Sequence, residues 1–151
     1  MDFLIENLPE YHIAYIRQTG PYGGNNVQVM ENLKKWAGEH NLFNEDSIIL
    51  GIAQDNPETT KPENCRYDTC IVVANDICKA DNYVQEGILP GGKYVVFKIN
   101  HTAEAVRDAW INIFPELVKQ CCEFDGSRQI MERYVVKMVN NHLCEICVPI
   151  K

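Results

Sequence analysis

The sequence lacks the features that mark several large classes of protein. No run approaches the roughly 20 apolar residues that cross a bilayer, and residues 1–6 have neither the basic region nor the apolar stretch of a signal peptide. Basic residues are outnumbered, with 14 Lys and Arg against 21 Asp and Glu and a net charge of −7. This balance argues against nucleic-acid binding through phosphate contacts. We therefore expect a cytoplasmic protein with no membrane or nucleic-acid partner.

Common catalytic and metal-binding motifs are missing as well. The sequence has no Ser-centred nucleophile elbow, phosphate-binding loop or dinucleotide fingerprint. Cys144 and Cys147 have CxxC spacing, but they lie in an expected strand, where residues three apart point to opposite faces. Cys121 and Cys122 have no partner pair at zinc spacing. We expect no metal and no cofactor, so any catalysis would use carboxylates, tyrosines and water. Without an export signal, the seven cysteines are expected to be reduced.

The pattern of elements repeats within what we expect to be one domain of residues 1–151. Residues 1–76 and 82–151 each give the order strand, helix, strand, strand. The expected strands cover residues 12–17, 47–53, 67–73, 93–98, 129–136 and 143–150, and the helices cover 25–40 and about 102–120. Pro115 should kink or restart the second helix. The predicted fold is α+β: duplicated β-α-β-β units form an antiparallel sheet with two main helices and a cleft between them.

Glu132 does not fit the pattern of its own strand. Side chains alternate between faces along a strand, which places Glu132 on one face with Ile130 and Tyr134. The opposite face carries Arg133 and Lys137, and we expect that face to be solvated. A carboxylate on an apolar face must be paired, protonated or available to a cation. Aligning the two halves puts Gly51 opposite Glu132, so one half supplies a carboxylate where the other leaves space.

Aromatic residues could form walls around this carboxylate. Trp110 and Phe114 are four residues apart on a helix and share a face. Tyr22 occupies the turn before the first helix, and Trp36 lies within that helix. These rings could simply be core residues. Combined with one carboxylate, they also suit a flat, hydrophobic cation through stacking and cation–π attraction.

At this point the sequence resembles the GyrI-like small-molecule-binding domain, also known as the AraC-type effector-binding domain. The resemblance covers nearly the whole chain. It rests on the order and spacing of segments 15–22 (YIRQTGPY), 33–36 (LKKW), 66–73 (RYDTCIVV), 89–94 (LPGGKY), 109–110 (AW), 132–134 (ERY) and 145–150 (EICVPI).

The resemblance implies a ligand cleft between the two helices with a glutamate at its centre that holds cationic aromatic drugs. That glutamate corresponds to Glu132, with Tyr134 nearby, and the family's helix tryptophan and turn tyrosine correspond to Trp110 and Tyr22. Many relatives carry a fused DNA-binding helix-turn-helix, for which this sequence has no residues left. The sequence departs from the family at Phe114, because many members have a second helix tryptophan in this region.

Three functions remain open from the sequence. The leading hypothesis is a monomer or weak dimer that binds hydrophobic, cationic aromatic compounds in xenobiotic tolerance. Glu132 would neutralise the charge, and the walls would be formed by Tyr22, Trp36, Tyr67, Trp110, Phe114 and Tyr134. Stand-alone relatives of the family suggest two alternatives. One is a hydrolase that opens the cyclopropane of DNA-alkylating natural products with Glu132 as the catalytic group, and the other is an interaction module that modulates DNA gyrase.

Overall fold

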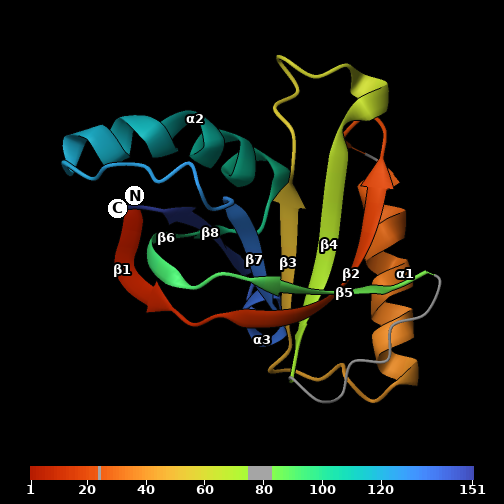
Figure 1. Ribbon diagram of the computed structural model, residues 1–151. Helices are drawn as coiled ribbons and strands as arrows, with labels where there is room; N and C mark the ends of the chain where they lie inside the picture. Colours follow the sequence, from red (N-terminus) through yellow and green to blue (C-terminus); the bar gives the residue numbers. More distant parts are fainter. Residues whose placement is uncertain (24, 75–82) are drawn as a thin grey trace.

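The computed structural model describes residues 1–23, 25–74 and 83–151, which form one antiparallel sheet with helices (Figure 1). The stretch 75–83, which we expect to link the two halves, lies outside the described residues except for residue 83. The elements are β1 (Asp2–Leu8), β2 (Tyr11–Thr19), α1 (Asn25–Glu39), β3 (Ile48–Ala53), β4 (Arg66–Val73), β5 (Gln85–Leu89), β6 (Gly92–Asn100), α2 (Ala103–Lys119), β7 (Met131–Val135), α3 (Val136–Val139) and β8 (Leu143–Pro149), with a 3₁₀ turn at Pro62–Asn64.

The sheet has eight strands in the order β1-β6-β8-β7-β3-β4-β2-β5. The units β2-α1-β3-β4 and β6-α2-β7-β8 repeat the same element order, which confirms the predicted α+β duplication. β7 and β3 pair at the centre, where the two units meet. The sequence reading missed β1 and β5. β1 precedes β2 in the chain but pairs with β6, and β5 precedes β6 but pairs with β2. Each unit thus receives an edge strand from the other.

The two main helices end in the same way, as expected of a duplication. After α1, the Leu42 N–H donates to the Ala37 carbonyl at 2.8 Å, and after α2 the Cys122 N–H donates to the Leu117 carbonyl at 2.9 Å. In both cases the preceding residue has a positive φ, of 58° and 56°. This is the geometry that closes helix C-termini. At the start of α2, the Thr102 side chain accepts a hydrogen bond from the Ala105 N–H and so caps the helix.

Both helices pack on the same face of the sheet. Leu33 and Ala37 of α1 are buried against residues of β2, β3 and β4. Ile113 and Leu117 of α2 are buried against residues of β6 and β8. α2 continues without interruption from Ala103 through Pro115 to Lys119, so the proline does not restart the helix.

The opposite face of the sheet is also buried, because the sheet bends and its two halves cover each other (Figure 1). Leu50 and Ile52 of β3 share one core cluster with Tyr94 and Val96 of β6. The expectation that the Arg133 face of β7 is solvated is therefore wrong at Arg133, which is 8% exposed.

Arg133 is accommodated in this interior by two carboxylates. Its Nε donates to Glu145 at 2.9 Å and its Nη2 donates to Glu6 at 3.4 Å. Lys137 on the same predicted face is exposed, but it lies in α3 because β7 ends at Val135. None of the described helices is long and apolar enough to cross a membrane.

Candidate functional site

A cavity of about 540 Å³ lies on the helical face of the sheet, between α1 and α3. α1 forms one wall of the cavity, and strands β3, β4 and β7 form its floor. His101, the residue before the N-cap of α2, closes one side. The cavity is lined by Asn26, Val27, Met30, Lys34, Phe43, Ile49, Tyr67, His101, Tyr134, Val136, Val139 and Asn140. Most of these side chains are apolar or aromatic, as is usual for a small-molecule site.

The α1 wall follows from the helical repeat. Val27, Met30 and Lys34 are three and four residues apart, so they form one stripe along the helix. The next stripe, with Leu33, faces the sheet and is fully buried. Met30 lies at the boundary between the two stripes, where it both contacts the core and lines the cavity.

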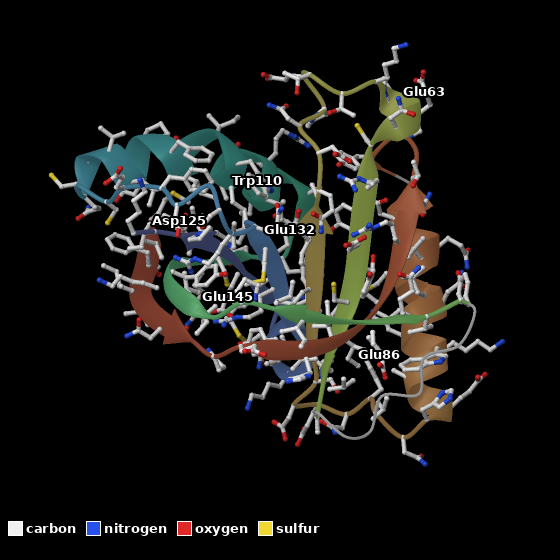
Figure 2. The ribbon with its side chains drawn as sticks, viewed as in Figure 1. Glu63, Glu86, Trp110, Asp125, Glu132 and Glu145 are labelled. Atoms are coloured by element: carbon white, nitrogen blue, oxygen red, sulfur yellow. The ribbon has the colours of Figure 1, made fainter. Side chains whose placement is uncertain are left out.

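Glu132 and Gly51 are direct partners in the β3–β7 pairing, which confirms the predicted alignment of the two halves. The missing side chain of Gly51 leaves the space that Tyr67 fills. A Cβ built on Gly51 would lie 2.1 Å from the Tyr67 hydroxyl oxygen, far closer than any van der Waals contact. The glycine thus lets the Tyr67 phenol of β4 lie over β3, the strand that pairs with β7. Glu132, labelled in Figure 2, is on β7.

The Glu132 carboxylate is mostly buried and accepts a hydrogen bond from the Tyr134 hydroxyl. Among the described residues, no Lys, Arg or His nitrogen lies within 4.0 Å of it. Burial raises the pKa of Glu132, and the Tyr134 hydrogen bond partly offsets this rise. Burial and the Glu132 charge raise the pKa of both Tyr67 and Tyr134. Both phenols therefore stay protonated and can donate hydrogen bonds near neutral pH.

The structure brings four of the seven proposed site residues together. Tyr67 and Tyr134 line the cavity, whereas Glu132 is not a lining residue but accepts a hydrogen bond from the Tyr134 hydroxyl. Tyr22 packs edge-on against Tyr67 with ring centroids 5.9 Å apart, and its hydroxyl donates to the Arg66 carbonyl at 2.7 Å. Tyr22 therefore contacts the lining residue Tyr67 without lining the cavity itself.

The other three proposed site residues do not line this cavity. Trp36 is buried in the core under α1 and stacks on His40 with ring centroids 4.5 Å apart. Trp110 and Phe114 lie on α2 and are 37% and 42% exposed. Phe114 contacts Phe124 edge-on at 5.5 Å. The shared helix face of Trp110 and Phe114 is partly solvent-exposed.

Several cavity residues were not identified from the sequence. His101 packs near the Tyr134 ring with centroids 5.5 Å apart, and no motif in the sequence marks it as a site residue. Val139 and Asn140 belong to or follow α3, a four-residue helix with too short a pattern to predict. Lys34 could have been found, because it continues the α1 stripe of Val27 and Met30.

An α+β fold with a duplicated unit and an aromatic-floored cavity beside a buried carboxylate has the form of a small-molecule-binding domain. The chain belongs to the GyrI-like small molecule binding domain family, which it matches over residues 1–151.

Two relatives and one solved structure illustrate the breadth of the similarity. The chain is 48% identical over 152 residues, covering 100% of both chains, to the "SPbeta prophage-derived putative transcriptional regulator YosT" of Bacillus subtilis. It is 29% identical to a DNA gyrase inhibitor of Cronobacter sakazakii over 89% of this chain and 86% of the relative. The structure of SAV2435 bound to tetraphenylphosphonium shares the fold, with a TM-score of 0.61 at 18% identity over 100% of this chain and 94% of that one.

Proposed function

We propose that this protein binds hydrophobic, cationic aromatic molecules in the cavity between α1 and α3, and that it thereby contributes to xenobiotic tolerance. The observation that carries the proposal is the Glu132 carboxylate, which is buried beside an aromatic cavity without a cationic side chain within 4.0 Å among the described residues. A buried charge is costly unless it is paired. A ligand cation would supply the missing partner.

The surrounding rings suit the rest of such a ligand. Tyr67 and Tyr134 form an aromatic floor, and Val27, Met30 and Ile49 add apolar surface. A delocalised cation has a weakly held hydration shell, so transferring it to this cavity costs less than transferring a compact ammonium. Cation–π attraction to the phenol rings contributes in addition. In the ligand-free protein, the Tyr134 hydroxyl stabilises the carboxylate in place of a ligand.

The test is a calorimetric titration with tetraphenylphosphonium, the ligand in the SAV2435 structure, against the uncharged triphenylphosphine oxide. We expect the cation to bind the wild type and the neutral compound to bind much more weakly. Glu132→Gln should weaken cation binding roughly tenfold or more, since it removes one close charge pair. Glu39→Gln, at the exposed end of α1, is the matched control and should leave affinity unchanged. Equal affinities of wild type and Glu132→Gln would refute the proposal.

Hydrolysis is a second candidate, favoured by the hydrogen-bonded pair of Tyr134 and Glu132 next to a second phenol, Tyr67. A carboxyl group with a raised pKa can exchange protons near neutral pH. For a cyclopropane conjugated to a carbonyl, water would add to a ring carbon, a ring C–C bond would break, and the proton would pass to the carbonyl side. Mass spectrometry of such an alkylator incubated with the protein would show a water adduct. Adduct formation at the buffer rate would exclude this activity.

A further inference from the structure

The cavity has opposite charges toward its two ends. The start of α1 lies at the end of the cavity nearer to Glu132. Tyr22, in the turn before α1, packs against Tyr67. The Tyr67 hydroxyl in turn lies over Gly51, which is the strand partner of Glu132. The chain that follows α1 lies at the α3 end. There the Val136 N–H donates to the Ser47 carbonyl at 3.0 Å, and the next N–H donates to residue 45 at 2.9 Å.

Lys34 belongs to the α3 end of this cavity. A rise of about 1.5 Å per residue places it roughly 12 Å along the helix axis from Asn26, the first α1 residue of the wall. On the floor, β7 runs from Glu132 through Tyr134 to its end at Val135, a span of about 10 Å at roughly 3.3 Å per residue, and α3 begins at the next residue. The α1 wall and the floor therefore lead from a carboxylate at one end to an ammonium group at the other.

The Lys34 ammonium has only one weak ionic contact within the described residues. Its Nζ lies 4.0 Å from a Glu31 oxygen on the same helix, and the two side chains are 40% and 65% exposed. Such exposed pairs contribute little. The Asn140 side chain lines the cavity too, and its amide can donate hydrogen bonds. Between the two ends, the cavity is lined by Met30, Ile49 and other apolar residues.

We propose that the cavity selects zwitterionic ligands, in which an anionic group lies roughly 10 Å from a flat cationic ring, a separation set by the helix and strand rises. The cationic ring would lie toward Glu132 and the phenols, and the anionic group would meet Lys34 and Asn140. This inference rests on the proposed cation binding and adds a second determinant to it. A cation without an anionic group would contact only the polar groups at the Glu132 end, and Lys34 would remain solvated.

The test compares two dyes with the same ring: acridine orange alkylated at N10 with a 5-carboxypentyl chain, and its methyl ester. Both are permanent cations, and only the acid is a zwitterion at pH 7. Dissociation constants come from fluorescence polarisation. We expect the wild type to bind the acid roughly fivefold more tightly than the ester, as one partly exposed ion pair would produce.

Variants separate the two determinants. Lys34→Met should abolish the preference for the acid while leaving affinity for the ester intact or slightly higher. The neighbouring Lys35→Met is the matched control, because Lys35 is exposed and does not line the cavity, so the preference should persist. Glu132→Gln should weaken the binding of both dyes and leave the ratio of their dissociation constants unchanged.

The possible failures are distinct. If both dyes bind equally to the wild type, or if Lys34→Met retains the preference for the acid, the zwitterion inference is wrong and cation binding stands. If neither dye binds, or if Glu132→Gln binds both as the wild type does, the proposed function fails together with the inference.

Discussion

Glu132 is held in surroundings that disfavour its charge, and this links ligand binding to pH. Burial raises the pKa of the carboxyl group above its ordinary value of 4.5, while the hydrogen bond from Tyr134 opposes the rise. A cation binds the ionised form, so a proton competes with the ligand for the same group. Binding should therefore be weak where the carboxyl is protonated and strong above its raised pKa.

We predict that the affinity for tetraphenylphosphonium increases with pH above 4.5, through the raised pKa of Glu132. Tyr134→Phe removes the hydrogen bond that stabilises the carboxylate, so the pH midpoint should move higher still. Glu132→Gln should show a flat profile. Calorimetric titrations from pH 4 to pH 8 measure all three. A wild-type affinity that does not change across this range would contradict the assignment.

The same carboxyl affects stability in the opposite direction. Because its folded pKa is raised, protonated Glu132 favours the folded state, and that contribution is present below its unfolded pKa and is lost as pH rises through the folded pKa. Glu132→Gln does not titrate. We predict that this variant gains stability relative to the wild type as pH increases from 4 to 7. Urea unfolding of both proteins at pH 4 and pH 7 measures the change. If the difference in unfolding free energy between variant and wild type is the same at both pH values, the prediction is wrong.

Gly51 controls the cavity floor through the space above it. In Gly51→Ala the new Cβ would lie 2.1 Å from the Tyr67 hydroxyl oxygen, so the phenol must move. We expect a loss of roughly 1–3 kcal/mol in unfolding free energy, typical of overpacking, together with weaker cation binding. Gly51→Ala combined with Tyr67→Phe should recover part of the stability, because the clashing oxygen is gone. If the double variant is no more stable than Gly51→Ala, the Tyr67 hydroxyl is not the cause of the lost stability.

At the scale of elements, the strand of Glu132 shows what alternation can and cannot predict. Period-two alternation correctly separated Glu132 from Arg133 and placed the carboxylate on the same face as Tyr134. It could not reveal that the other face is buried as well. That burial comes from the bend of the sheet and from β1 and β5, which pair with the opposite unit. Long-range strand pairing of this kind leaves no local sequence pattern.

α2 tolerates a proline at a cost that should be measurable. Pro115 has no N–H, so the Ile111 carbonyl lacks its usual intrahelical donor. We predict that Pro115→Ala stabilises the protein by roughly 1–3 kcal/mol in urea unfolding, up to the full helix-interior penalty of proline. Thr102→Ala, which removes the N-cap bond from Ala105, should destabilise it by about 1 kcal/mol. A destabilising Pro115→Ala would mean that the ring itself contributes to packing.

At the scale of the whole molecule, the repeat located the carboxylate but not the walls around it. Aligning the two halves placed Glu132 opposite Gly51, and the β3–β7 register confirms it. Trp110 of α2 does not line the cavity, which lies between α1 and the four-residue helix α3 directly after β7. In the first unit the corresponding connection, between β3 and β4, contains the 3₁₀ turn at Pro62–Asn64. An asymmetry created by a four-residue helix cannot be read from a repeat.

Ion pairs on the sheet face away from the cavity connect the edge strand β1 to β7 and β8. Arg133 of β7 binds Glu145 of β8 at 2.9 Å and Glu6 of β1 at 3.4 Å. Arg133→Met would leave Glu145, whose side chain is 10% exposed, without a cation. We predict a loss of roughly 3–5 kcal/mol in unfolding free energy, the usual effect of breaking a buried pair from one side.

Two further variants test whether the loss comes from the unpaired charge. Adding Glu145→Gln to Arg133→Met should restore part of the stability, because it neutralises the carboxylate that was left buried. Lys137→Met breaks the exposed pair with Asp46, whose side chains are 63% and 74% exposed, and should change stability by less than about 1 kcal/mol. Because the network lies on the face away from the cavity, cation affinity in folded Arg133→Met protein should match the wild type. A lower affinity at full folding would show that the two faces of the bent sheet are coupled through β7.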